Sequence, residues 1–164
     1  MRRIIQAGTV ASTAVLLGGL ALAAPASAAP AAAQTVTATY DCGSYGVTDL
    51  KIEASAEGGV GSVKVSTSGG LAPADIPADS VTATLRLERA SGGTVDFTGT
   101  ANEAAPAGEP LTVGPLTAPV TEGDSLDSYI PADGSDVASL DLEILGQANT
   151  CKAVSKQTPG PIVF

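Results

Sequence analysis

The stretch TVTATYDC, residues 35–42, alternates polar and apolar residues without interruption. Side chains of a β-strand point to opposite faces in turn, so this period of two predicts a strand with one buried face. The residues predicted to face inward are Val36, Ala38, Tyr40 and Cys42. The apolar face of this strand must therefore be covered by a second layer of the protein.

The same alternation returns along the chain. It recurs in residues 50–56, 63–65, 81–87, 95–97 and 140–144. Glycine-rich turns such as EGGVG and PADG separate these segments, and no segment after residue 28 carries apolar residues at helical spacing. Roughly seven short strands predict an all-β fold, a single antiparallel β-sandwich of immunoglobulin-like type. Residues 69–80 and 101–136 are expected to be its longest loops.

The first residues carry the pattern of an export signal. Arg2 and Arg3 precede an apolar run, and Ala26 and Ala28 occupy the small-residue positions that a signal peptidase reads. We expect a signal peptide at residues 1–28, a flexible lead-in at 29–34 and one β-sandwich domain at 35–164. The mature chain would carry no membrane anchor and would be secreted, either free outside the cell or associated with the cell wall.

The chain has two cysteines, Cys42 and Cys151. Cys42 lies too far past the predicted cleavage site to carry a lipid anchor, and two cysteines without histidine make a poor metal site. In an exported protein, an even number of cysteines indicates a disulfide. We therefore predict a Cys42–Cys151 bond that joins the first and last strands and supports a core with few aromatic residues.

The absence of histidine from the whole sequence excludes Ser-His-Asp and Cys-His catalysis. Gly123-Asp124-Ser125-Leu126 matches the GDSL signature of a hydrolase family, but that family needs a histidine base, so Ser125 is not expected to be a nucleophile. Two pairs offer lysine-activated serines, Ser62 with Lys64 and Ser155 with Lys156. Neither spacing predicts a contact, and no catalytic or cofactor-binding residue is expected.

Two further segments leave alternatives open. The acidic residues Glu122, Asp124, Asp127, Asp133 and Asp136 form either a solvated loop or a set of oxygen ligands for calcium, although their spacing is not that of an EF-hand. The last residues, TPGPIVF (158–164), form either a segment packed on the sheet or a tail recognised by a partner. Packing is the simpler interpretation because Ile162, Val163 and Phe164 are apolar.

Several motifs together resemble a group of small secreted actinobacterial proteins of unassigned function. These are ATYDCG after the signal peptide, GPLTAPV and GDSLDSYIP in the middle, and a late cysteine followed by TPGPIVF. The resemblance implies secretion and a compact β fold. It implies no activity and no site residues.

Composition limits the partners that such a protein can bind. Acidic residues outnumber basic ones 17 to 8 and give a formal net charge of −9, which repels nucleic acids and anionic membranes. We expect a non-catalytic module without a cofactor that interacts with a protein or another cell-surface partner. The alternatives are a small-ligand carrier, which needs a cleft of ligand size, and a protease inhibitor that presents residues 71–80 (LAPADIPADS) as a bait loop.

Overall fold

The computed structural model describes residues 31–72 and 74–164, so the predicted signal peptide and its cleavage site lie outside the described residues. The strands are β1 (Ala31–Asp41), β2 (Val47–Glu57), β3 (Val60–Leu71), β4 (Val81–Arg89), β5 (Thr94–Thr100), β6 (Pro110–Pro119), β7 (Ser125–Ser128), β8 (Leu140–Ile144), β9 (Gln147–Ala153) and β10 (Ile162–Val163). A short 3₁₀-helix, η1 (Gly43–Tyr45), connects β1 to β2. β1 thus begins at Ala31 rather than at Thr35.

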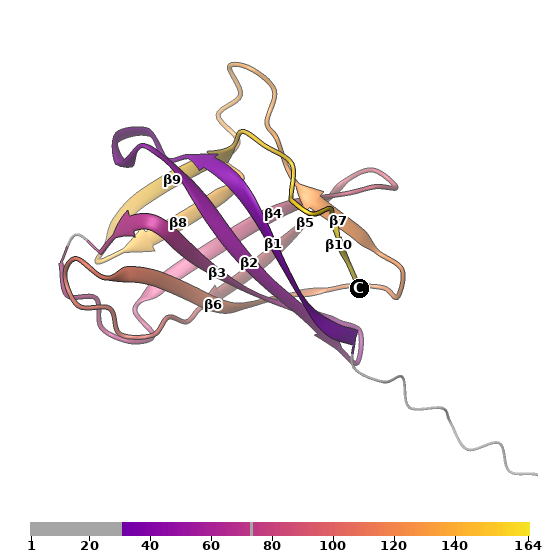
Figure 1. Ribbon diagram of the computed structural model, residues 1–164, viewed down its shortest axis with the longest axis horizontal. Helices are drawn as coiled ribbons and strands as arrows, with labels where there is room; N and C mark the ends of the chain where they lie inside the picture. Colours follow the sequence, from indigo (N-terminus) through magenta and orange to yellow (C-terminus); the bar gives the residue numbers. More distant parts are fainter. Residues whose placement is uncertain (1–30, 73) are drawn as a thin grey trace, which may run out of the picture.

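The prediction of an open, immunoglobulin-like sandwich is wrong, because the sheet closes on itself. The order of strands is β10-β7-β4-β5-β6-β3-β2-β1-β9-β8, and β8 also pairs with β4. This last pairing joins eight strands into a closed antiparallel barrel, in the order β4-β5-β6-β3-β2-β1-β9-β8 (Figure 1). Closure removes the open edges that a sandwich keeps.

Two narrow seams complete the ring. β5 pairs with β6 only at Thr98 and Thr117, with a further bridge between Asn102 and Val113. β1 pairs with β9 only through Tyr40 with Ala153 and Asp41 with Lys152. The disulfide between Cys42 and Cys151 lies directly beside this second seam, with a Cα–Cα distance of 4.0 Å. It therefore joins two neighbouring strands of the barrel, β1 and β9, and not the first strand to the last.

The last residues of the chain form hydrogen bonds with the part of β1 that β9 does not reach. Thr158 exchanges two backbone hydrogen bonds with Thr37, each 2.9 Å long, and the side chain of Gln34 bonds the backbone of Val163. β10 in turn pairs with β7, which shares one edge of β4 with β8. Consequently the segment that follows β9 is a structural part of the barrel wall.

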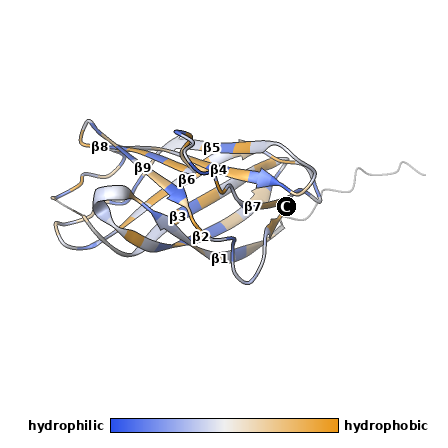
Figure 2. Cartoon of the chain, turned by 90° about the horizontal axis from the view of Figure 1, so that it is seen from above, coloured by the Kyte–Doolittle hydropathy of each residue, from blue (hydrophilic) through white to orange (hydrophobic). Residues whose placement is uncertain are grey.

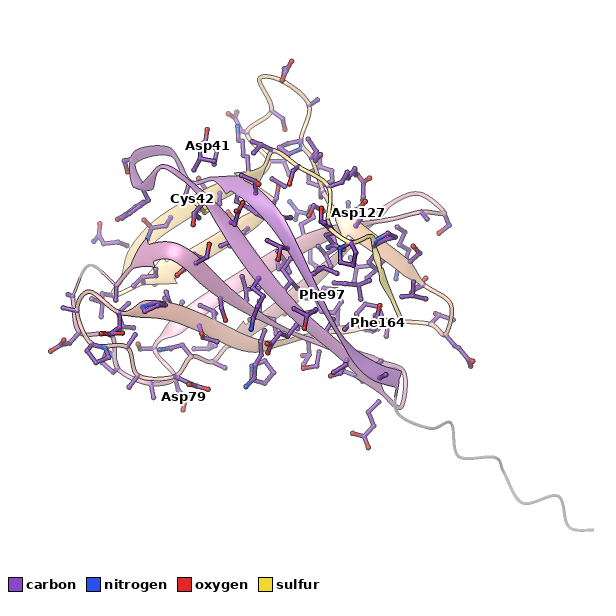
Figure 3. All side chains as sticks on the ribbon, in the orientation of Figure 1. Asp41, Cys42, Asp79, Phe97, Asp127 and Phe164 are labelled. Atoms are coloured by element: carbon purple, nitrogen blue, oxygen red, sulfur yellow. A yellow bond between two sulfur atoms is a disulfide. The ribbon has the colours of Figure 1, made fainter. Side chains whose placement is uncertain are left out.

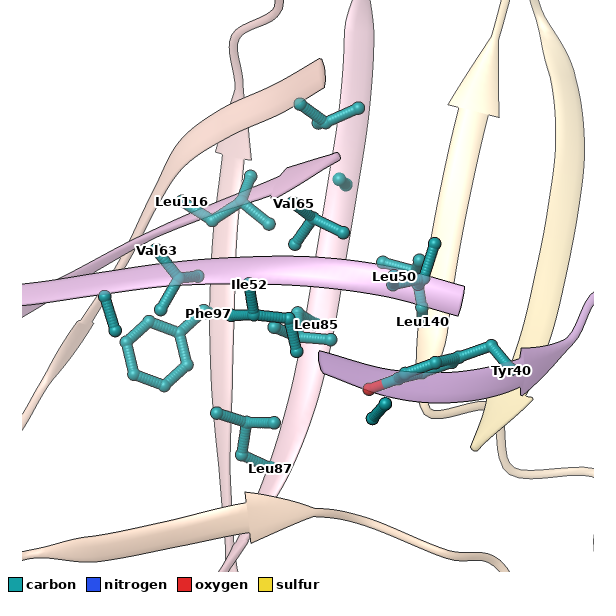
Figure 4. Packing of buried hydrophobic residues seen from close by; sticks show 14 of the residues in the cluster. Tyr40, Leu50, Ile52, Val63, Val65, Leu85, Leu87, Phe97, Leu116 and Leu140 are labelled. Atoms are coloured by element: carbon teal, nitrogen blue, oxygen red, sulfur yellow. The ribbon is translucent and has the colours of Figure 1, made fainter. Parts of the chain in front are cut away.

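The alternating residues predicted from the sequence form the core. Figure 2 shows apolar and polar residues alternating along the strands, and Figure 4 shows the inward side chains meeting inside the barrel. The residues without exposed surface include Tyr40, Ile52, Val63, Val81, Leu85, Leu87 and Phe97. Val36 and Ala38 are also buried, and Cys42 packs against the core although it is partly exposed, so the inward face predicted for residues 35–42 is confirmed.

The expected loop at residues 101–136 contains two strands, β6 and β7. β6 carries buried Leu111, Val113 and Leu116, but the register with β3 shifts between Val113 and Leu116. Gly114 occupies this bulge at a φ of +119°, where a Cβ atom would lie 2.6 Å from the carbonyl oxygen of Val63. The bulge changes the phase of the alternation, which is why the period of two does not reveal this strand.

Asn102 is a buried polar residue, only 5% exposed, that holds the loop between β3 and β4 in place. Its Oδ1 accepts hydrogen bonds from the backbone N–H groups of Ser80 and Val81, at 2.8 and 2.9 Å. Its Nδ2 donates to the carbonyl oxygens of Pro77 and Glu103, both at 2.8 Å. One buried amide thereby satisfies four backbone groups and holds this loop against the end of the barrel.

Candidate functional site at the open end of the barrel

The two ends of the barrel differ. At one end Phe97 and Phe164 stack with ring centroids 5.8 Å apart. They pack over Gly61, where a Cβ atom would lie 2.9 Å from Phe97 and 2.8 Å from Val120. These side chains close that end, and Figure 3 shows Phe164 on the opposite side of the molecule from Cys42.

The end beside Cys42 is hollow. An apolar pocket of about 180 Å³ opens there, enclosed by the inward faces of β2, β3, β6, β8 and β9. Its wall is built mainly from Leu111, Leu142 and Ile144 together with the disulfide. Leu142 and Ile144 continue the inward face of buried Leu140, but they are only partly buried because no aromatic plug covers this end.

A second hollow of about 50 Å³ continues the first toward the core. The two share Leu111, Leu142 and both cysteines, and the deeper one adds fully enclosed residues such as Leu50 and Leu116. Engineered apolar cavities of about 150 Å³ bind benzene, so the space suits one small ring or a short branched chain.

The rim of the pocket is apolar and exposed. Tyr45 of η1 is 63% exposed and Leu145, in the turn between β8 and β9, is 50% exposed. Leu145 has a φ of +51° and Gly146 a φ of +75°, the combination of a type I′ hairpin turn that favours Asn-Gly. A leucine costs energy in this conformation, and strained residues concentrate at functional sites.

A few uncharged polar groups complete the lining. Gln147 and Asn149 of β9 contribute near the rim, and Thr48 and Thr67 lie on the inward faces of β2 and β3. The Thr67 hydroxyl accepts a hydrogen bond of 3.3 Å from the backbone N–H of Leu111. None of the described residues that line this pocket is charged.

The predicted Cys42–Cys151 disulfide is present, with an S–S distance of 2.00 Å. It lies in the wall of both hollows. The bond therefore lines the candidate site in addition to supporting the closure of the barrel. The sequence analysis predicted only the structural role.

The GDSL motif forms the start of β7. Ser125 pairs with Val163 of β10, and its carbonyl oxygen accepts a 2.9 Å hydrogen bond from Ala90. Ser125 therefore lies in a short strand between β10 and the edge of β4.

The two serine–lysine pairs also have structural surroundings. Lys64 is exposed on the outer face of β3, as the alternation around Ser62 predicts. Lys156 forms an ion pair with Glu88, and the Ser155 hydroxyl accepts a 2.8 Å hydrogen bond from the backbone N–H of Thr39. The Ser155 hydroxyl donates to the backbone carbonyl oxygen of Lys156 at 3.1 Å, and the ammonium group of Lys156 bonds Glu88 and the carbonyl oxygen of Ser128 instead of Ser155.

The acidic segment does not converge on a common centre. The Thr121 N–H and the Arg89 guanidinium hold the pKa of Asp124 below its usual value. Asp127 Oδ1 accepts hydrogen bonds from the backbone N–H groups of Ser128 and Gln157, at 2.7 and 2.8 Å. Within residues 31–72 and 74–164, no three acidic or cysteine side chains are grouped so that they could hold a metal ion.

The two remaining candidate segments are packed. Ile162 is fully buried and Phe164 is 7% exposed, so the last residues cover the core. In the proposed bait loop, Ile76 is 2% exposed and exchanges backbone hydrogen bonds with Ala105. Ile76 at the centre of that loop therefore packs against the protein, whereas Asp75 before it and residues 77–79 after it are exposed.

Sequence reasoning found the two cysteines and the inward residues of segment 140–144 but missed the other residues that form the pocket. Leu111 belongs to a strand taken for a loop, and Tyr45 and Leu145 belong to turns. One signal could have shown the site. At Thr48 and Thr67 a threonine occupies an inward position where the alternating pattern would otherwise place an apolar residue.

No protein-family model, curated protein or solved structure matches this chain. No helix within the described part of the chain is long and apolar enough to cross a membrane.

Proposed function

We propose that this protein is an extracellular, non-catalytic binding protein that holds a small, largely apolar molecule in the open end of its barrel. The observation that carries the proposal is the contrast between the two ends. One end is closed by Phe97 and Phe164, whereas the other leaves an apolar pocket of about 180 Å³. Eight-stranded barrels have an interior of a size that side chains fill or that holds one small ligand.

Three further observations support this proposal. The pocket lies where the rim is apolar and exposed, so a ligand would remove that surface from water. Leu145 adopts an unfavourable backbone conformation at the mouth of the pocket, which function would explain. The disulfide is compatible with a place outside the cell.

The second candidate function is an interaction module that accepts one apolar side chain of a protein or cell-surface partner. The exposed rim favours it, because Tyr45 and Leu145 line the opening and are 63% and 50% exposed. Contiguous exposed apolar surface is typical of interaction sites. A small molecule remains the better fit because the hollow reaches inward beyond the rim to Leu50 and Leu116.

The proposal is tested by titrating the methyl-labelled protein with methylcyclohexane and with toluene while recording NMR spectra. We expect saturable shifts of the methyl groups of Leu111, Leu142 and Ile144, and none at Leu126 near the closed end. Saturable binding with this pattern supports the proposal. Shifts that are absent up to the solubility limit of both probes, or that spread evenly over the core, would contradict it.

A blocking variant and a matched control sharpen the test. Ile144→Trp places a larger side chain in the pocket wall and should weaken binding at least tenfold. Val60→Trp introduces the same side chain at an exposed position, the first residue of β3 at the closed end, and should bind as the unaltered protein does. The melting temperature of each variant verifies that it is folded. Equal binding by the two variants would place the ligand elsewhere.

A further inference from the structure

Thr48 is a polar residue at an inward position of the barrel. It precedes Leu50 and Ile52 on the same face of β2, and these two are 1% and 0% exposed. In the register with β1 it pairs with Tyr40, which is also fully buried. The side chain thus continues the core-facing row of β2 into the lining of the open pocket.

The hydroxyl of Thr48 is buried and has no hydrogen-bond partner among the described residues. Its counterpart Thr67, one strand along, accepts the N–H of Leu111. A buried hydroxyl without a partner is unfavourable, and most such groups in folded proteins are paired. Because this oxygen has almost no exposed surface, the side chain must turn its hydroxyl toward the pocket to meet a ligand, and the hydrogen bond formed there would remove this penalty.

The charge of the site restricts the ligand further. None of the described lining residues is charged, and the whole chain has a formal net charge of −9. A charged group would lose its hydration in this apolar pocket without gaining an opposite charge, and an anion would also be repelled by the protein. The pocket therefore favours an uncharged molecule.

We propose that the ligand is a neutral molecule with a compact apolar body and one hydroxyl or carbonyl group that hydrogen-bonds to Thr48 Oγ1. This inference rests on the proposed function, since it assigns the chemistry of the same pocket. The apolar body fills the space between Leu111, Leu142 and Ile144, and the polar group points to β2. Thr48 is then the residue that selects an alcohol or ketone over a hydrocarbon of the same shape.

The test compares cyclohexanol with methylcyclohexane, which differ in one polar group. Both are titrated by NMR against the unaltered protein and against Thr48→Val, which keeps the shape of the side chain but lacks the hydroxyl. We expect this variant to bind cyclohexanol about fivefold more weakly, as the loss of one hydrogen bond predicts, and to bind methylcyclohexane unchanged or more tightly. The affinity ratio of cyclohexanol to methylcyclohexane is compared between this variant and the unaltered protein, so the different solubilities of the two probes cancel.

Two other variants control this comparison. Thr48→Ser keeps the hydroxyl and should retain the preference for cyclohexanol, which a purely structural role of Thr48 would not require. Thr35→Val makes the same change at an exposed position of β1 and should leave both affinities unchanged.

The outcomes separate the two proposals. If both probes bind in the pocket and Thr48→Val does not change their ratio, the role of Thr48 is overturned while the proposed function stands. If neither cyclohexanol nor methylcyclohexane binds the unaltered protein, both proposals fall. A loss of preference in Thr48→Val that Thr48→Ser restores supports the assignment.

Discussion

Phe97 of β5 and Phe164 at the end of the chain stack at 5.8 Å although they are distant in sequence, and this contact closes one end of the barrel. Phe164→Ala should lower the free energy of unfolding by about 3–4 kcal/mol, because it removes a buried aromatic ring and leaves a cavity. Urea denaturation measures this loss. Val163→Ala, at a neighbouring residue that is 48% exposed, is the matched control and should cost less than about 1 kcal/mol. Equal effects would show that the last residues do not cover the core.

Gly114 is required at the bulge of β6. A Cβ atom there would lie 2.6 Å from the carbonyl oxygen of Val63 and 3.0 Å from the Cα atom of Lys64. Gly114→Ala should therefore destabilise the fold by more than about 3 kcal/mol, from the clash added to the positive φ. Gly92→Ala is the control, since Gly92 has a φ of +97° but no atom near its Cβ position, so only the backbone cost of about 1–2 kcal/mol applies. Thermal melts of both variants decide whether the close contact matters.

The sequence predicts strands correctly where the alternation of polar and apolar residues is unbroken. It fails where a bulge shifts the phase of that alternation. Residues 35–42 and 81–87 show their inward faces directly, whereas the bulge at Gly114 hides β6. Closure of the barrel depends on the pairing of β4 with β8, a contact between distant segments that leaves no local pattern. An open sandwich and a closed barrel require the same alternation, so the fold class could be predicted but its closure could not.

The candidate site shows the same limit. The cysteine count and the expectation of export predicted the disulfide correctly, because only two cysteines were available to pair. The pocket beside it is a space left by residues from five strands and their connecting segments, and the described lining residues have ordinary apolar or uncharged polar side chains. Only the barrel geometry shows that Leu142 and Thr48 face the same hollow.

Burial of Tyr40 predicts a loss of stability at high pH. Desolvation raises the pKa of Tyr40 to about 12 in the folded protein, and the neighbouring Ser128 hydroxyl lowers it slightly. Because the unfolded chain releases this proton near pH 10, it binds fewer protons than the folded state above that pH, and stability falls as pH rises from about 10 to 12. The single group accounts for roughly 3 kcal/mol over this range. Tyr40→Phe should flatten this part of the curve.

The same variant tests the hydrogen bonding of Tyr40. Its hydroxyl and that of Ser128 are buried without a partner that meets hydrogen-bond geometry in the described structure. Removal of an unpaired buried hydroxyl is nearly neutral or stabilising, so Tyr40→Phe should change the stability at pH 7 by less than about 1 kcal/mol. Chemical denaturation at pH 7 and pH 11 gives both values. A large loss at pH 7 would mean that the hydroxyl is paired.

The disulfide should contribute strongly because it closes a long loop. Cys42 and Cys151 are separated by 109 residues, for which the loop-entropy model gives about 4–5 kcal/mol. The double variant Cys42→Ala and Cys151→Ala should lose about this much free energy of unfolding, measured in urea. The first disruption should appear at the seam of β1 and β9, since the lost disulfide lies beside the two residue pairs that join these strands. Hydrogen exchange that is instead fastest at β5 and β6 would contradict this.

Leu145 links stability to binding, since it lines the pocket and adopts a φ of +51° in the turn between β8 and β9. Asparagine tolerates this conformation better, so Leu145→Asn should raise the free energy of unfolding by about 0.5–1 kcal/mol. The same change removes apolar surface from the mouth of the pocket and should weaken the binding of methylcyclohexane. Asp79→Gly is the control, because Asp79 also has a positive φ, of +54°, but does not line the pocket; it should leave binding unchanged. Denaturation and NMR titration of both variants test this trade-off, and unchanged binding by Leu145→Asn would remove Leu145 from the site.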